Sequence, residues 1–219
     1  IDLNASQSEA WAGLANANIL MGMNLIQAPD EAFQKARSAA EQAARITPCM
    51  PEALTALAWV RLCHNRDWDG AEEYFRQALK AKPSYAFAHN GVALLEIARG
   101  HMQEAIVSLK EARRLNPLSA PLEALLSRTY CMARMFKEAV ETGRRAVISN
   151  PDSCIAHCAL ALGLIQVQRL EEAIDHFEKA RQLSGESAVY VGFWAYGSGL
   201  AGRRTDAELG LINFMSLAT

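Results

Sequence analysis

Apolar and polar residues follow one another along this chain with the spacing of amphipathic helices, and the same block recurs six times. Each block predicts a first helix of about 14 residues, a short turn and a second helix of similar length. Three prolines that close successive blocks, Pro83, Pro117 and Pro151, are 34 residues apart. Because a proline ends one helix before the next begins, this spacing predicts a stack of helical hairpins.

Small residues mark the places where the helices are expected to pack closely. In each first helix a large apolar residue is followed directly by a small one: Leu14-Ala15, Leu57-Ala58, Val92-Ala93, Leu126-Ser127, Leu160-Ala161 and Trp194-Ala195. Each second helix carries an alanine near its start, at Ala36, Ala71, Ala105, Ala139, Ala173 and Ala207, and all but the last repeat it seven residues later. Seven residues is about two helical turns, so both alanines lie on one face.

Three blocks depart from the regular pattern. The first holds about nine inserted residues between Asn18 and Ala36, so its helices or their connection must be longer. The second is one residue longer than the rest, and aligning its helices with the others places this residue in the turn around His64 to Gly70. In the fifth, Gly185 replaces the closing proline. Residues 1–4 resemble the end of a preceding second helix.

These features resemble the tetratricopeptide repeat family, from about Ser6 to Leu217. The resemblance implies an all-α fold, a right-handed α-solenoid of six helical hairpins. We predict one solenoid over residues 1–219, with repeats at about 6–50, 51–85, 86–119, 120–153, 154–187 and 188–219. The long first block is similar, more narrowly, to repeat regions of bacterial winged-helix transcriptional regulators and some adenylate cyclases.

Composition narrows the classes of partner. Charged residues are 21% of the chain with a formal net charge of −2, which argues against nucleic acid or an anionic membrane as a partner. Apolar runs are far shorter than the roughly 20 residues that span a bilayer. The five cysteines are odd in number and most lie within predicted helices, which favours free thiols in the cytoplasm. Because the chain begins at Ile1 without a signal segment, we expect a piece of a longer protein.

Few residues suggest catalysis or metal binding. Cys154, His157 and Cys158 lie at i, i+3 and i+4 of a predicted helix, a spacing that could hold a metal ion, but no second cluster supplies a fourth ligand. The alternative is that the two cysteines fill space and His157 takes the position that Trp11 holds in the first block. His89 shares that position, and three other histidines look isolated: His64, His101 and His176. We therefore predict no enzyme, no cofactor and no metal.

The resemblance also implies where a partner would bind, because first helices line the concave side of such arrays. The inward positions are mainly apolar, and we predict a groove for a protein or peptide segment formed by Asn16, Trp59, Phe87, Asn90, Leu94, Arg128, Leu162 and Tyr196. Asn90 stands alone where relatives that clamp a C-terminal carboxylate carry several Lys and Asn residues, so such a clamp is disfavoured. The alternative for Trp59 is packing between adjacent hairpins.

Two further hypotheses concern function. The preferred one is a noncatalytic scaffold, and the alternative is a regulatory or sensory region of a bacterial transcription factor or signalling enzyme. The last predicted helix carries apolar residues without a polar helix after it: Leu209, Leu211, Ile212, Phe214, Met215 and Leu217. Because terminal repeats normally need a polar cover, either more chain follows or two copies meet there as a symmetric homodimer.

Overall fold

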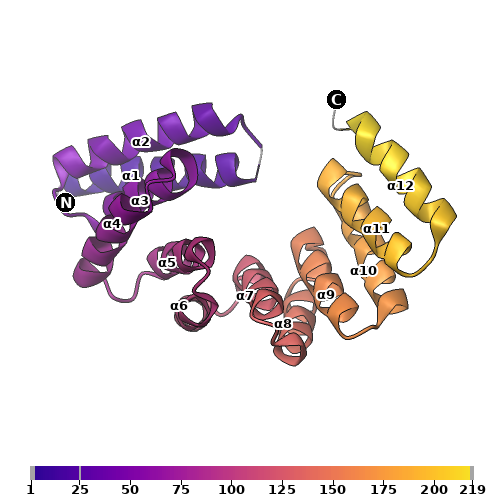
Figure 1. Ribbon diagram of the computed structural model, residues 1–219. Helices are drawn as coiled ribbons and strands as arrows, with labels where there is room; N and C mark the ends of the chain where they lie inside the picture. The colour runs from indigo at the N-terminus through magenta and orange to yellow at the C-terminus, as the bar shows by residue number, and fades with distance from the viewer. Residues whose placement is uncertain (1–2, 25, 218–219) are drawn as a thin grey trace. The chain divides into compact units, whose positions relative to one another are not determined.

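This computed structural model describes residues 3–24 and 26–217, with side chains from residue 7 onward. These residues form twelve α-helices and one π-helical turn, joined by short turns and loops. The α-helices pair into six antiparallel hairpins, which confirms the predicted all-α repeat fold (Figure 1). The chain divides into two compact units, Ile1–Leu115 and Asn116–Thr219. Each unit holds three hairpins and is described by itself, and the single solenoid stays a prediction.

The first unit opens with the longest hairpin. Its helices span 21 and 18 residues, which confirms that the inserted residues lengthen both of them. Leu3 already belongs to the first of these helices, so the prediction that residues 3 and 4 end a preceding helix is wrong, and residues 1 and 2 lie outside the described part. The helices of this unit are α1 (Leu3–Met23), α2 (Pro29–Ile46), α3 (Pro51–Val60), η1 (Arg61–Asn65), α4 (Trp68–Ala81), α5 (Ala86–Arg99) and α6 (Met102–Leu115).

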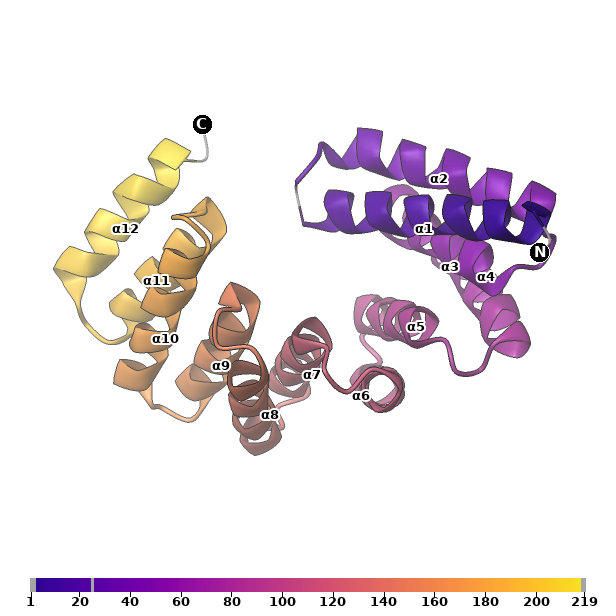
Figure 2. The ribbon, with the colours of Figure 1, turned by 180° about the vertical axis from the view of Figure 1, so that it is seen from behind.

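The second unit consists of three hairpins whose helices all have 13 or 14 residues. Figure 2 shows α11 and α12 side by side at its C-terminal end. The chain turns between hairpins where the sequence predicts it, after Ser149 and after Leu183. Its helices are α7 (Ala120–Met132), α8 (Phe136–Ser149), α9 (Cys154–Gln166), α10 (Leu170–Leu183), α11 (Ala188–Leu200) and α12 (Arg204–Leu217).

Small residues bring the helices together as the pattern predicts. The paired alanines of α2, α4, α6, α8 and α10 are all buried. Phe75 of α4 fills the space beside Gly91 of α5, where an added Cβ would overlap the phenyl ring. At Gly143 the neighbouring helix approaches instead, because an added Cβ would lie 2.8 Å from the Cα atom of Leu160. Large and small residues thus alternate across the interfaces between hairpins.

The extra residue of the second hairpin lies in η1. In every hairpin after the first, a residue with positive φ lies in the turn that follows the first helix. Successive residues of this set are 34 positions apart: Arg66, Gly100, Arg134, Gln168 and Gly202. The insertion therefore precedes Arg66, at the beginning of the predicted region from His64 to Gly70. A π-helical turn accommodates one added residue because its hydrogen bonds run from i to i+5.

A compact group of side chains follows this π-helical turn. Asp67 caps α4 by accepting a hydrogen bond of 3.0 Å from the Gly70 backbone N–H, and its carboxylate also pairs with Arg61. The Arg61 guanidinium lies 5.1 Å from the centre of the Tyr74 ring. Both contacts lower the pKa of Asp67, the backbone hydrogen bond more than the arginine. The turn is thus tied to the first two turns of α4.

Candidate partner-binding surfaces

Three successive first helices of the first unit bring predicted groove residues together through Tyr85. The Asn16 side chain of α1 donates a hydrogen bond of 3.2 Å to the Tyr85 hydroxyl. The Tyr85 ring lies 6.4 Å from Phe87 of α5, and Phe87 stacks on Trp59 of α3 at 5.1 Å. Sequence reasoning missed Tyr85, although its place two residues before Phe87 was a usable signal. The tyrosine thus links residues that are far apart along the chain.

Trp59 does not form part of an accessible surface. Its side chain is 0% exposed, enclosed between the stacked Phe87 ring and the edge-on Phe75 ring at 6.2 Å. A side chain without exposed area cannot contact a partner, so its assignment to the groove is wrong and the packing alternative holds. The reason is that α4 and α5 close over α3 from both sides, which the inward position of Trp59 in its own helix does not reveal.

Polar atoms beside this aromatic group lack partners. Within the described part of the chain, the amide oxygens of Asn16 and Asn90 accept no hydrogen bond although both atoms are buried. Thr55 Oγ1 and Trp59 Nε1, in the same unit, are also without a partner among the described residues. Burial raises the pKa of Tyr85, and the hydrogen bond from Asn16 opposes that rise. A buried polar atom without a partner costs about 1–3 kcal/mol, so the oxygens of the half-buried Asn16 and Asn90 side chains favour a ligand or water that would satisfy them. Thr55 and Trp59 are 0% exposed, so a partner cannot reach their atoms.

The predicted residues of the second unit are more dispersed. Arg128 of α7 is exposed and forms no ion pair with any residue that the structure describes. Leu162 of α9 is half-buried in the apolar cluster that includes Phe193, and Tyr196 of α11 is 51% exposed. Arg128 lies near the thiol of Cys158. Burial raises the pKa of this thiol, and the charge of Arg128 lowers it. The unit therefore offers an exposed cation and an exposed aromatic ring to a partner.

The cysteine and histidine group of α9 is packed rather than open. Cys158 and His157 are buried, and burial raises the pKa of Cys158 to about 12. The Nδ1 atoms of His157 and His176 lie 2.8 Å apart, so the prediction that His176 is isolated is wrong. No group of three or more possible metal-ligating side chains occurs among the described residues. A thiol with so high a pKa stays protonated at neutral pH, which disfavours metal ligation.

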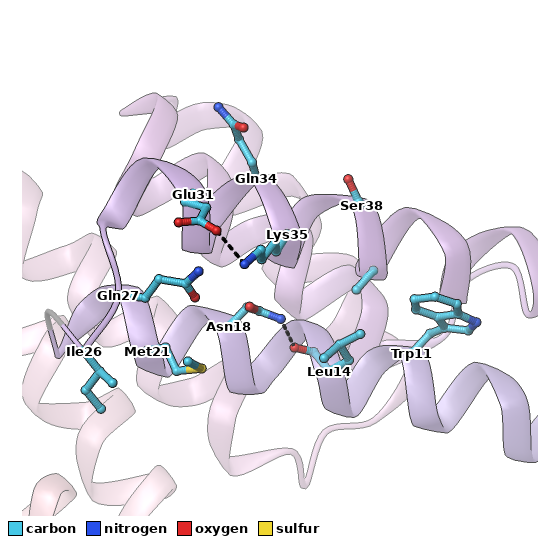
Figure 3. A pocket seen from close by; sticks show the side chains of 11 residues that line it. Trp11, Leu14, Asn18, Met21, Ile26, Gln27, Glu31, Gln34, Lys35 and Ser38 are labelled. Atoms are coloured by element: carbon cyan, nitrogen blue, oxygen red, sulfur yellow. Dashed lines mark hydrogen bonds and ion pairs between the residues drawn. The ribbon is translucent and has the colours of Figure 1, made fainter.

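A wide groove of about 830 Å³ lies on the first hairpin, between α1 and α2 (Figure 3). Trp11, Leu14 and Met21 of α1 give it an apolar side. The α2 side is polar, with Glu31 and Lys35 paired at 2.6 Å beside Gln34 and Ser38 as additional lining residues. Sequence reasoning assigned no role to this groove, although the length of the first block was the signal for it.

Two lining residues of the groove, Trp11 and Ala39, also belong to the apolar clusters that join the first hairpin to α3. The other residues of α1 and α2 that are buried in these clusters do not line the groove: Ala12, Ala15, Ile19, Phe33, Ala36, Ala40 and Ala43. Asn18, which lines the groove, is buried and donates a hydrogen bond of 2.8 Å to the Leu14 carbonyl (Figure 3).

No helix of the described residues is long and apolar enough to cross a membrane.

Comparisons with known proteins agree with the repeat pattern. The profile of a family described as tetratricopeptide repeat matches residues 30–86 and 64–120. No curated protein sequence matches this chain. A thermophilic tetratricopeptide repeat protein of Thermus thermophilus is similar in structure, with 22% identity and a TM-score of 0.68 over 84% of this chain and 98% of its own.

Two other solved structures are similar along most of their length. PilW, a type IV pilus biogenesis factor, has 18% identity and a TM-score of 0.73 over 94% of this chain and 98% of its own. YrrB, a tetratricopeptide repeat protein with an unusual peptide-binding site, has 18% identity and a TM-score of 0.59 over 83% and 93%. At such identities the likeness establishes the shared fold.

Proposed function

Because this chain is a tetratricopeptide repeat protein, we propose that it is a noncatalytic scaffold that binds a protein segment through the inner faces of its first helices. The observation that carries the proposal is the group of Asn16, Tyr85, Phe87 and Asn90 in the first unit. It combines half-buried aromatic surface with two amide oxygens that have no partner among the described residues. YrrB supports the proposal by analogy, since its fold is similar and it has a peptide-binding site.

The chemistry of these residues indicates the segment that would fit. Phe87 and Leu94 would bury an apolar side chain, while the Asn16 and Asn90 oxygens would accept hydrogen bonds from backbone N–H groups after the amides rotate outward. Such groups suit an extended or helical peptide, whose backbone or side chains supply donors. In the second unit, Arg128 would pair with an acidic group and Tyr196 would stack on an apolar one. Each unit thus offers its own contact surface.

A display experiment tests this proposal. Peptides would be selected from a random phage library against the purified chain, and the dissociation constant of the best peptide measured by calorimetry. We expect the Phe87→Ala/Leu94→Ala variant to weaken binding at least about tenfold, because truncating a buried anchor at an interface typically costs more than 1 kcal/mol. Asn90→Ala should weaken it less, by the value of one hydrogen bond.

A matched control separates binding from folding. Ile148 is an exposed apolar residue on the second helix α8, so Ile148→Ala should leave the affinity unchanged. Circular dichroism melts would show that each variant is folded at the temperature of the measurement. Unchanged affinity of the folded Phe87→Ala/Leu94→Ala variant would contradict the proposed site, and so would a library that yields no peptide for the wild-type chain.

The narrower hypotheses stay predictions. The long first hairpin is the one feature that favours a regulatory or sensory region, and none of the comparisons above supports that reading. A cytoplasmic location rests on five cysteines that are free in the structure. The symmetric homodimer through α12 also stays a prediction.

A further inference from the structure

A row of three side chains crosses the first helices of the second unit. Arg128 of α7, Leu162 of α9 and Tyr196 of α11 follow one another at intervals of 34 residues, and each stands directly after the small residue of its large and small pair. Equivalent positions in equivalent helices place the three side chains on the same face. Arg128 and Tyr196 are exposed and Leu162 is half-buried, so each of them has accessible surface.

Arg128 is the exposed charge of this face. Of the residue types Asp, Glu, Lys and Arg, the helices α7, α9 and α11 contain only Glu123 and Arg128. Glu123 is buried, and its carboxylate lies 3.8 Å from the guanidinium of Arg145. The three helices therefore present one positive charge among apolar side chains and no exposed carboxylate beside it.

The other arginines of the second unit show how its positive charges are otherwise satisfied. Residues 116–219 contain eight arginines. Six of them form ion pairs with a glutamate, and all six stand on a second helix or in the turn before one: Arg144, Arg145, Arg169, Arg181, Arg203 and Arg204. Arg128 forms no ion pair with any residue that the structure describes, and neither does Arg134, which lies in an exposed turn.

The charge of Arg128 reaches the two neighbouring helices of the row. Burial raises the pKa of Cys158 on α9 and of Tyr190 on α11, and the charge of Arg128 acts against that rise at both groups. A charge has such an effect only from nearby. The Arg128 side chain thus lies beside groups of α9 and α11, in half-apolar surroundings where an ion pair is stronger than in open water.

We propose that Arg128 binds the side-chain carboxylate of an Asp or Glu in the segment that this chain recognises, and that Leu162 and Tyr196 bind apolar side chains further along that segment. This pairing rests on the proposed function and names the chemistry that the second unit adds to it. A planar guanidinium without an acidic neighbour can donate two parallel hydrogen bonds to a carboxylate. A side-chain carboxylate fits better than a chain terminus, because α7, α9 and α11 contain no Lys or Asn to complete a terminal clamp.

The row also determines the spacing of the recognised residues. Ser127 Oγ of α7 lies 3.5 Å from the Ala159 carbonyl oxygen of α9, and Leu162 shares an apolar cluster with Phe193 of α11, so successive first helices are neighbours. Packed helices lie about 8–10 Å apart, and an extended peptide advances about 3.3 Å per residue. We therefore expect an acidic residue, an apolar residue about three positions away and another apolar or aromatic residue about three positions further.

Charge reversal tests the pairing. Random peptides, fused at their C-terminus to a phage coat protein, would be selected against the wild-type chain, Arg128→Glu and the matched control Arg134→Glu. The control changes the net charge equally, and both arginines are exposed, so folding should tolerate either change. We expect the wild type and the control to select Asp or Glu, and Arg128→Glu to select Lys or Arg at the same place. Circular dichroism would show that each variant is folded.

A double-mutant cycle measures the pair itself. With the best wild-type peptide, calorimetry would compare Arg128→Gln with a peptide whose acidic residue is replaced by its amide. Each change alone should weaken binding at least about fivefold, and both together no more than either one, because each removes the same contact. One glycine inserted between the acidic and the apolar residue of the peptide should also weaken binding, because it breaks the spacing.

Several results would overturn this assignment. Wild-type peptides without an acidic preference, or the same acidic preference in Arg128→Glu, would show that Arg128 does not bind a carboxylate. A spacing of roughly five to seven residues would indicate a helical segment, which rises about 1.5 Å per residue, and would contradict the extended register. Affinity that depends on Phe87 and Leu94 but not on Arg128 would refute the pairing and leave the proposed function standing. A library that yields no peptide for the wild-type chain would contradict both.

Discussion

His157 and His176 face each other across the fifth hairpin with their Nδ1 atoms 2.8 Å apart. The other ring nitrogen of His157, Nε2, lies 2.9 Å from the carbonyl oxygen of Pro151. A carbonyl only accepts hydrogen bonds, so His157 Nε2 carries a proton and donates it. Neutral His157 then presents an unprotonated Nδ1, which accepts a hydrogen bond from His176 Nδ1–H. A further proton on His157 would place two N–H groups face to face.

This pair predicts that the protein loses stability as pH falls. Burial lowers the pKa of His176, and the neighbouring His157 lowers it further, although Glu172 and Asp175 act in the opposite direction. A folded-state pKa below the unfolded value of about 6.5 means that folding favours the neutral ring. The contribution is therefore complete above about pH 6.5 and is lost as the pH falls below that value.

Thermal melts at a series of pH values check this expectation. The midpoint should fall between pH values of about 7.5 and 5, and His176→Gln should show a smaller fall because it cannot take up the proton. Arg144 also lies near His176 and lowers its pKa. Arg144→Gln should therefore make the fall of the melting midpoint smaller without abolishing it. A wild-type midpoint that does not change, or one that changes equally in His176→Gln, would show that this pair does not set the pH dependence.

Gly91 and Gly13 predict opposite effects of the same substitution. Gly91→Ala would drive a methyl group into the buried Phe75 ring and should destabilise the fold by about 1–3 kcal/mol. Gly13→Ala meets no neighbouring atom and removes a helix-interior glycine, so it should stabilise the fold by roughly 0.5–1 kcal/mol.

Urea denaturation of both glycine variants, at concentrations where the chain is monomeric, measures the difference. The double variant Gly91→Ala/Phe75→Leu should recover part of the loss, because the smaller side chain yields space. Equal effects at Gly91 and Gly13 would mean that helix propensity alone decides the outcome, and would argue against the close contact of α4 and α5.

Cysteine labelling checks the burial of the predicted thiol cluster. Burial raises the pKa of Cys158 to about 12, and that of Cys63 to about 11, while Cys49 is exposed. Since the thiolate is the reactive form, the thiolate of Cys158 should be on the order of a thousandfold scarcer at neutral pH than that of an ordinary cysteine. With iodoacetamide we expect Cys49 to react first and Cys158 last.

Mass spectrometry of the labelled peptides identifies the order of reaction. Cys49→Ser should remove the fast phase and leave the slow ones unchanged. Denatured chain should label at all five cysteines at similar rates, which controls for differences in detection. Rapid labelling of Cys158 in the folded chain would show that α9 opens on the time scale of the reaction.

Much of the fold could be predicted from the sequence because its information is local. The pair Val92-Ala93 and the position of Pro117 each give information about residues within one hairpin. Within a helix, the spacing of two residues along the sequence determines whether they lie on the same face. The insertion near His64 shows the limit of this reasoning. A count of residues reveals that one is added, but whether a turn or a π-helical turn absorbs it depends on how Arg61 and Asp67 pack against α4.

The candidate site was less predictable. The resemblance to a family places Asn16, Phe87 and Asn90 on one face of their helices, yet burial depends on what neighbouring hairpins cover. Trp59 stands at an inward position and is nevertheless enclosed, because Phe75 and Phe87 reach it from two other helices. Tyr85 and Asn16 meet although 69 residues separate them.

The sequence by itself determined the period, the six pairs of helices and the residues that end them, because helix-forming patterns and prolines act over a few residues. Only the tertiary structure decided which of the inward side chains are enclosed and that His157 and His176 share a hydrogen bond. Those outcomes depend on contacts between elements distant in the chain, where the close packing of one hairpin on the next determines what remains accessible.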